Sequence, residues 1–273
     1  MLLAVDVGNT HTVSGVFSGD KIIAEWRLKS DRDRTGDELA IRYHALFQMA
    51  GIEQRKISEF IISSVVPTLE TAWMSFAERY IAGQLNVPPI VVNHTTPTGI
   101  TVTTDNPAEV GADRIVNSVA AWHRFKQSLI VVDFGTAITF DCVNSTREYV
   151  GGAILPGLAI SLDALAARTA KLPRIDINKA PSRAIGRNSV DAIRSGLLVG
   201  FGGMVDRMVD RLADELSAGG GKVKIIGTGG MAKIIAPFSE HLNVFDPLLT
   251  LKGLKIIFDL NSNHERQSVD YTS

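Results

Sequence analysis

The chain has 273 residues, of which 45% are hydrophobic and 21% charged, a composition that predicts one large or two medium globular domains. Its formal net charge of −1 gives no sign of a nucleic-acid partner or of binding to an anionic membrane. A single cysteine, Cys142, excludes an internal disulfide and indicates a reducing compartment. No apolar run approaches the roughly 18 residues of a membrane span, and the N-terminus lacks the basic region of a signal peptide. We therefore expect a cytoplasmic protein.

The first half of the chain predicts alternating strands and helices. Three strands come first, at 2–7, 13–17 and 21–28, and a polar turn joins the first two. A charged loop, which includes the "SDRDR" run at 30–34, then leads into a helix that ends at Gly51. The apolar face of this helix is formed by Leu39, Tyr43, Leu46 and Phe47. Further on we expect a strand at 59–67, a helix at 68–81, a strand at 88–93 and a helix at about 108–125.

The second half repeats this order. A strand is predicted at 128–135, its hairpin partner at 137–144 and a third strand at 148–157. Helices follow at about 158–170 and 189–217, then a strand at 222–230 that ends in glycines. The repeat predicts two similar α/β domains, 1–115 and 116–258, with a nucleotide cleft between them. The polar residues 259–273 are expected to form a disordered tail.

The two predicted halves begin with similar segments, "LLAVDVGNT" at 2–10 and "LIVVDFGTA" at 129–137. In each, a buried strand ends in an aspartate, Asp6 or Asp133, followed by a glycine and polar residues. Such a turn can surround a phosphate with main-chain and hydroxyl donors, while the carboxylate holds a hydrated Mg²⁺. The alternative is that an Asp-Gly turn simply closes a hairpin. No Walker A sequence is present.

A third segment, "NPAEVGADRIVNSVAAW" at 106–122, brings charged side chains to the start of a predicted helix. Asp113 can accept a proton from a substrate hydroxyl as that hydroxyl attacks a γ-phosphate. Arg114 can pair with a carboxylate or a phosphate. The alternative is purely structural, compensation of the helix dipole together with a surface ion pair, and this stretch alone favours it.

These segments together resemble the type III pantothenate kinase family. The resemblance is carried by "DVGNTHT" (6–12), "GADR" (111–114) and "DFGTAITFD" (133–141), and later by "GGAILPG", "GRNSVDAIRSG" and "IIGTGG". It extends from residue 1 to about 258. It implies two RNase H-like domains of the acetate and sugar kinase, Hsp70 and actin superfamily. The implied reaction is ATP-dependent phosphorylation of pantothenate in coenzyme A biosynthesis, by a homodimer that uses Mg²⁺ and a monovalent cation, K⁺ or NH₄⁺.

The resemblance also implies roles for individual residues. Asp113 would be the catalytic base, Asp133 the ligand of the monovalent cation and Thr136 a contact to ATP. The first phosphate loop, with Asp6 also holding Mg²⁺ through ATP, would comprise Asp6, Val7, Gly8, Asn9, Thr10, His11, Thr12 and Val13. The pantothenate site would comprise Gly111, Ala112, Asp113 and Arg114, with a further contact from Ser189.

At two of the implied contacts, Ser189 and Thr104, this chain differs from the residue that is usual in the family. Ser189, where the family more often has Thr, has an alternative role, because it or Asn188 can cap the helix that follows. Many family members have a Tyr before the "NP" of the substrate segment, where this chain has Thr104. A Thr can form a hydrogen bond there but offers no aromatic ring.

Two other functions remain open from the sequence. One is a regulatory relative, similar to a transcriptional activator, that kept the fold and lost catalysis; the presence of Asp6, Asp113 and Asp133 argues against it. The other is a kinase that phosphorylates a different hydroxylated metabolite. Residue chemistry alone predicts a two-domain phosphotransferase, and only the resemblance points to pantothenate.

Overall fold

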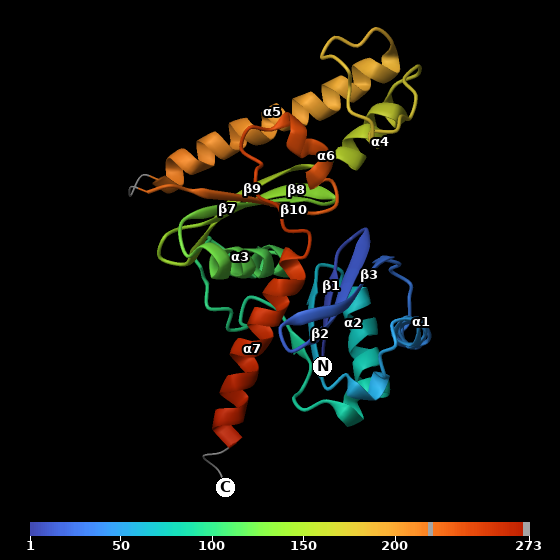
Figure 1. Ribbon diagram of the computed structural model, residues 1–273, viewed down its shortest axis with the longest axis vertical. Coiled ribbons are helices and arrows are strands. Elements are labelled where there is room, and N and C mark those ends of the chain that lie inside the picture. Colours follow the sequence, from blue (N-terminus) through green and yellow to red (C-terminus); the bar gives the residue numbers. More distant parts are fainter. Residues whose placement is uncertain (218–220, 270–273) are drawn as a thin grey trace. The chain divides into compact units, whose positions relative to one another are not determined.

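A computed structural model describes residues 1–217 and 221–269, and side chains up to residue 262 (Figure 1). The chain divides into two compact units. The first contains Met1–Ala120 and the segment that begins at Leu249, and the second contains Ala121–Leu248. None of the described helices is long and apolar enough to cross a membrane.

The sheet of the first unit is built around its N-terminal strand. The strands are β1 (Leu2–Val7), β2 (His11–Ser18), β3 (Lys21–Lys29), β4 (Glu59–Ser64) and β5 (Ile90–Val91), in the order β3-β2-β1-β4-β5. β1 pairs with β2 in antiparallel and with β4 in parallel orientation. Every residue of β1 except Asp6 is buried, which matches its continuous apolar sequence.

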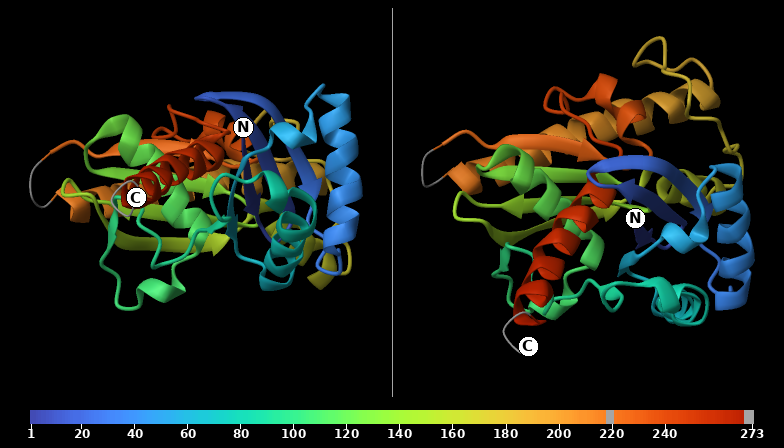
Figure 2. Two further views of the ribbon diagram at one scale, coloured as in Figure 1. Left: turned by 90° about the horizontal axis from the view of Figure 1, so that it is seen from below. Right: turned by 60° about the horizontal axis from the view of Figure 1, so that its bottom comes forward.

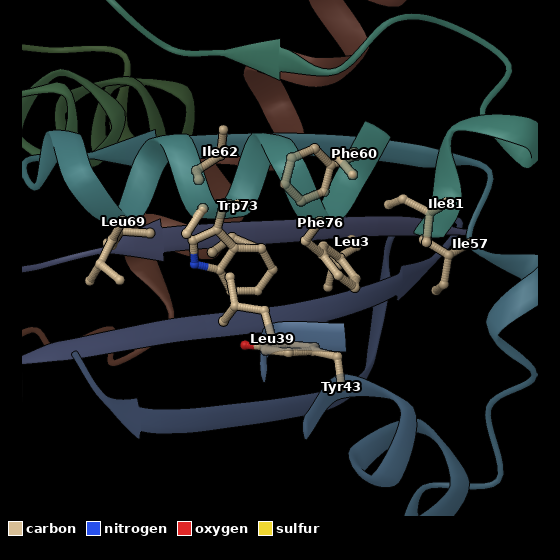
Figure 3. Close-up of a cluster of buried hydrophobic side chains, with 14 of the residues drawn as sticks. Leu3, Leu39, Tyr43, Ile57, Phe60, Ile62, Leu69, Trp73, Phe76 and Ile81 are labelled. Carbon is tan, nitrogen blue, oxygen red and sulfur yellow. The ribbon is translucent and has the colours of Figure 1, made fainter. Parts of the chain in front are cut away.

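Two helices cover one face of this sheet, α1 (Gly36–Met49) and α2 (Pro67–Phe76), which continues as a π-helical turn over Ala77–Ile81. Thr35 and Glu38 form a capping box that starts α1. Figure 3 shows Leu39 and Tyr43 of α1 beside Trp73 and Phe76 of α2 in one buried cluster. The ring centroids of Tyr43 and Trp73 are 4.7 Å apart, so an aromatic contact joins the two helices.

The other face of β1 and β4 is covered by the last helix, α7 (Leu249–Val269), which is the red helix of Figures 1 and 2. Its buried side chains include Leu251, Leu254 and Phe258. The remaining elements of the first unit are short: 3₁₀ turns at Gln54–Lys56, Ala82–Gln84 and Pro107–Glu109, and strand β6 (Thr101–Val102). Helix α3 (Ala112–Phe125) begins in this unit and ends in the other.

The second unit repeats the meander of the first. Its strands β7 (Leu129–Phe134), β8 (Ala137–Val143), β9 (Glu148–Pro156) and β10 (Lys224–Thr228) lie in the order β10-β7-β8-β9. β7 pairs with β8 in antiparallel and with β10 in parallel orientation, as β1 does with β2 and β4. Helices α5 (Ser189–Leu216) and α6 (Ala232–Ile235) cover one face, with α4 (Leu158–Arg168) before them and a 3₁₀ turn, Ala236–Phe238, after them.

The predicted α/β fold and its repeated strand–turn–strand–strand order are confirmed, but the predicted domain limits differ from the units. The predicted boundary at 115/116 falls inside α3, and the contacts divide the chain at Ala120/Ala121. The expectation of a disordered tail is wrong for residues 259–269, because they extend α7. Residues 270–273 lie outside the described part of the chain. Since α7 packs on β1 and β4, its segment also belongs to the first unit instead of the second.

Candidate active site

The first predicted phosphate loop joins β1 to β2, and a main-chain hydrogen bond closes it. Gly8 N–H donates to the carbonyl of His11 at 3.1 Å, and a β-carbon at Gly8 would lie 3.0 Å from the same oxygen. A glycine therefore fits this turn best. Asn9, Thr10 and His11 are exposed at the tip of the loop, whereas Thr12 is buried. Partial desolvation, and then the charge of Arg27, lowers the pKa of His11, although the residue is exposed.

Ser30, at the end of β3, binds this loop at three points. Its N–H donates to Thr10 O at 2.9 Å, its hydroxyl donates to Gly8 O at 2.6 Å, and it shares a 3.0 Å hydrogen bond with the Thr12 hydroxyl. Arg32 of the "SDRDR" run donates to Asn9 Oδ1 at 3.2 Å. The charged loop at 30–34 therefore supports the first phosphate loop.

The Asp6 carboxylate, near the end of β1, is half-buried and accepts a hydrogen bond from β4. The Ser63 hydroxyl of β4 donates to Asp6 Oδ1 at 2.7 Å. Asp6 pairs with Val13 across the hairpin and with Ser63 in the parallel register. A carboxylate at a strand end, beside a loop with exposed amide and hydroxyl groups, fits a hydrated Mg²⁺ carried by a nucleotide phosphate.

Asp113 lies in the first turn of α3, and its carboxylate packs against Gly111. Its Oδ1 accepts from Arg114 N–H at 2.8 Å, and a β-carbon at Gly111 would lie 2.6 Å from that oxygen. Burial raises the pKa of Asp113, an effect that the Arg114 N–H bond and the Arg114 charge oppose. Of its predicted neighbours, Ala112 is buried and Arg114 is half-buried. A half-buried carboxylate with a raised pKa has the character of a general base.

Asp133 ends β7, and its loop differs from the first loop in length. Gly135 N–H donates to Ala137 O at 3.0 Å, so this turn closes one residue earlier than the Gly8–His11 turn. Thr136, the predicted ATP contact, is exposed at its tip, and its carbonyl accepts from Gly157 N–H at 3.1 Å. This bond ties the turn to the start of α4.

Gly229, directly after β10, packs against the Asp133 carboxylate. Its φ is +88°, and a β-carbon there would lie 2.5 Å from Asp133 Oδ1 and 2.7 Å from Phe134 N. Gly229, a glycine of the "IIGTGG" segment, therefore allows the backbone to pack closely against Asp133.

Ser189 and Thr104, the two residues that differ from the family pattern, lie in different surroundings. Asn188 caps α5, because its Oδ1 accepts from Asp191 N–H at 2.8 Å. Ser189 is therefore the exposed first residue of the helix and not its cap. Thr104 is half-buried, and its hydroxyl oxygen is buried and has no hydrogen-bond partner among the described residues. Such a group needs a donor or acceptor from outside the described residues.

Sequence reasoning missed three residues that support the site: Ser30, Ser63 and Gly229. Each comes from a segment distant in sequence from the loop that it contacts, so no local spacing could reveal it. The parallel pairing of β4 with β1 and of β10 with β7 brings Ser63 and the Gly229 turn into place. Within 1–217 and 221–269, no three His, Cys, Asp or Glu side chains gather into a metal-binding group.

Comparisons with known proteins identify the family of the chain. A family profile for type III pantothenate kinase matches residues 2–211. A type III pantothenate kinase of Desulfotalea psychrophila is 53% identical over 94% of this chain and 97% of its own length. Another, of Geobacter sulfurreducens, is 45% identical over 96% of this chain and 99% of its own length.

Solved structures share the fold at low identity. A Baf family transcriptional activator from Campylobacter jejuni has a TM-score of 0.57 at 20% identity, covering 96% of this chain and 99% of its own. A 2-dehydro-3-deoxygalactonokinase from Sinorhizobium meliloti has a TM-score of 0.53 at 16% identity, covering 94% and 95%. These likenesses show a shared fold, which in this chain is an α/β fold with two five-stranded sheets. The sequence matches are closer, and by them the chain belongs to the type III pantothenate kinase family.

Proposed function

We propose that this protein transfers the γ-phosphate of ATP to the primary hydroxyl of pantothenate. The products are 4′-phosphopantothenate and ADP, and the reaction is the first step of coenzyme A biosynthesis. The observation that carries this proposal is the 53% identity with a type III pantothenate kinase over 94% of the chain. The half-buried Asp113 at the start of α3 supplies the chemistry that such a reaction requires.

Asp113 is the general base. Its carboxylate takes the proton of the pantothenate hydroxyl while the hydroxyl oxygen forms a bond to the γ-phosphorus, and the bond from that phosphorus to the β–γ bridging oxygen breaks. The raised pKa strengthens the carboxylate as a base. Its contact with Arg114 N–H fixes the orientation of the carboxyl group.

Pantothenate binds beside this base, at Gly111, Ala112 and Arg114. A guanidinium is suited to the pantothenate carboxylate, with which it can form two parallel hydrogen bonds. Ser189 is a further contact to the substrate. The buried, unpartnered hydroxyl oxygen of Thr104 supports a substrate hydrogen bond at that position in place of the family's Tyr.

ATP phosphates bind at the loop from Asp6 to Val13, where the exposed side chains of Asn9, Thr10 and His11 surround the tip. Asp6, together with the phosphates, would hold Mg²⁺, which would supply positive charge against the negative charge of the phosphoryl group. In the second unit Thr136 contacts ATP, and Asp133 holds the monovalent cation, K⁺ or NH₄⁺. Support for the cation role comes from the position of the Asp133 carboxylate, next to the exposed turn that contains Thr136.

The protein acts as a cytoplasmic homodimer. Support comes from one face of α5, where Gly196, Gly200 and Gly203 are exposed beside Val199, 41% exposed, and Met204, 38% exposed. An exposed stripe of small and apolar residues on a long helix is suited to close packing against a second copy.

The test is an acceptor comparison. Purified protein with ATP, Mg²⁺ and K⁺ should form phosphopantothenate from pantothenate and should leave unrelated hydroxylated metabolites unchanged. Omission of K⁺ should lower the rate. If the folded protein binds ATP and forms no phosphopantothenate, the proposal is wrong. Transfer to another acceptor at a higher rate would identify a different kinase.

A regulatory protein without catalysis is the second candidate, and it is not favoured. The likeness to the Baf family transcriptional activator is one of fold, at 20% identity. The chain retains Asp6, Asp113 and Asp133, and its matches at 45–53% identity are to pantothenate kinases.

A further inference from the structure

The Asp6 carboxylate has a buried hydroxyl neighbour outside every motif discussed above. Ser63 lies on β4, opposite Asp6 in the parallel register, so both side chains project from the same face of the sheet. The Ser63 hydroxyl lies 2.7 Å from Asp6 Oδ1. Since an ionised carboxylate can only accept, the serine hydroxyl is the donor.

We infer that Ser63 is a positioning residue for the metal–nucleotide site, and that its hydroxyl orients the Asp6 carboxylate toward the divalent ion that accompanies ATP. This inference rests on the proposed role of Asp6. A hydrogen bond from a hydroxyl to a carboxylate is charge-assisted, and it fixes the χ angles of a short side chain. It thereby determines which oxygen of Asp6 faces the loop that receives the phosphates.

The duplicated fold supplies an internal comparison. Thr228 lies opposite Asp133 in the parallel register of the second sheet, as Ser63 lies opposite Asp6 in the first. The single hydroxyl hydrogen of Thr228 is donated to the main-chain oxygen of Asp246 at 2.8 Å. Only in the first unit does the equivalent hydroxyl donate to the strand-end carboxylate. This difference fits the two proposed roles, a hydrated divalent ion at Asp6 and a monovalent cation at Asp133.

Burial makes this contact hard to replace. Ser63 is fully buried, so solvent has no access to the space that its hydroxyl would leave. In Ser63→Ala the Asp6 carboxylate would lose this hydrogen bond and gain rotational freedom. Loss of an outer-sphere partner of a metal ligand typically lowers metal affinity about 10- to 100-fold.

The experiment measures metal binding without turnover. Mn²⁺ is titrated into full-length protein saturated with a non-hydrolysable ATP analogue, and free Mn²⁺ is followed by electron paramagnetic resonance. Ser63→Ala should weaken Mn²⁺ binding about 10- to 100-fold. Binding of the analogue alone, in EDTA, should stay within about twofold of the wild type, because the loop backbone is unchanged.

Ser64→Ala is the matched control. Ser64 is the next residue of β4, and its hydroxyl donates to Val66 O and accepts from Val66 N–H, both at 3.1 Å. This variant should bind Mn²⁺ as the wild type does. Ser63→Cys keeps a side chain of similar shape with a weaker donor, so its Mn²⁺ affinity should fall between those of the wild type and Ser63→Ala. It also serves if Ser63→Ala does not fold.

The Asp6→Asn variant distinguishes the proposed metal-binding role of Asp6 from the inferred positioning role of Ser63. If Asp6→Asn loses Mn²⁺ affinity while Ser63→Ala and Ser63→Cys keep it, Ser63 has no positioning role and the inference is overturned. If Asp6→Asn itself binds Mn²⁺ like the wild type, the proposed role of Asp6 fails, and the inference with it. An equal loss in Ser64→Ala and Ser63→Ala would also overturn it, because the effect would then reflect general disturbance of β4.

Discussion

Asp6 and Asp133 end equivalent strands, yet their neighbours differ in kind. Asp6 accepts a hydrogen bond from a buried serine, whereas Asp133 has a glycine packed against its carboxylate. The motif "D-x-G" identified both aspartates from the sequence, because the apolar strand and the glycine turn are local. The neighbours were not predictable in this way. They come from β4 and from the turn after β10, and only strand pairing brings them near.

The raised pKa of Asp113 predicts a pH-dependent stability difference. Because the folded protein binds this proton more tightly than the unfolded chain, its free energy of unfolding falls as pH rises from the ordinary Asp range through the raised pKa. Asp113→Asn cannot ionise, and its Oδ1 can still accept from Arg114 N–H. Thermal unfolding across this pH range should therefore show the variant gaining stability relative to the wild type as pH rises. A constant difference would contradict the raised pKa.

A side chain at Gly229 should disturb the Asp133 site. Gly229→Ala places a methyl group 2.5 Å from Asp133 Oδ1 in a left-handed backbone conformation. We expect a loss of about 1–3 kcal/mol in the free energy of unfolding and a higher K⁺ concentration for half-maximal activity. Urea unfolding and a K⁺ titration measure the two effects.

Gly83→Ala is the control for that substitution, since Gly83 is exposed and a β-carbon there meets no atom within 4 Å. It should leave stability and K⁺ dependence unchanged. If Gly229→Ala shows the same K⁺ dependence as the control, Asp133 does not hold the monovalent cation.

At the scale of elements, the apolar patterns predicted most strands and helices, and the errors have identifiable causes. The strand predicted at 88–93 is only two residues long, Ile90–Val91, although its apolar run is longer. The helix predicted from about 108 begins at Ala112, because Pro107–Glu109 forms a separate 3₁₀ turn. Leu46, expected on the apolar face of α1, is only half-buried, while Leu39, Tyr43 and Phe47 are buried. Apolar sequence patterns predict that a helix or strand exists more reliably than where it begins and ends, because its ends depend on caps and turns.

The exposed face of α5 yields a prediction about assembly. Gly200→Arg introduces a long charged side chain at an exposed position where a β-carbon meets no atom within 4 Å. The subunit should therefore fold, and the proposed dimer should dissociate. Light scattering should give the mass of a monomer, and circular dichroism should be unchanged.

Gly83→Arg makes the same chemical change at an exposed glycine of the first unit and should leave the dimer intact. A dimer that survives Gly200→Arg would show that this face of α5 is not the interface.

At the scale of the whole molecule, the sequence predicted the duplication but not that the C-terminal segment packs in the first unit. Two strand–turn–strand–strand openings, each followed by helices and further strands, were predicted from repeated patterns. In the structure a later strand of each unit, β4 or β10, pairs in parallel with the first strand. No final helix was predicted, and residues up to 258 were assigned to the second domain. In the structure, α7 instead begins at Leu249 and packs against β1 and β4 of the first unit.

Phosphoryl transfer by the wild type and by Asp113→Asn, measured side by side, tests the account most directly. ATP, Mg²⁺, K⁺ and pantothenate are incubated with each protein, and 4′-phosphopantothenate is quantified by mass spectrometry. Asp214→Asn, the same change at an exposed residue of α5, is the control. The wild type and the control should form product at equal rates. Asp113→Asn should fold, bind ATP and turn over about 10²–10⁴-fold more slowly. Near-normal turnover in Asp113→Asn, or no phosphopantothenate from the wild type, would contradict it.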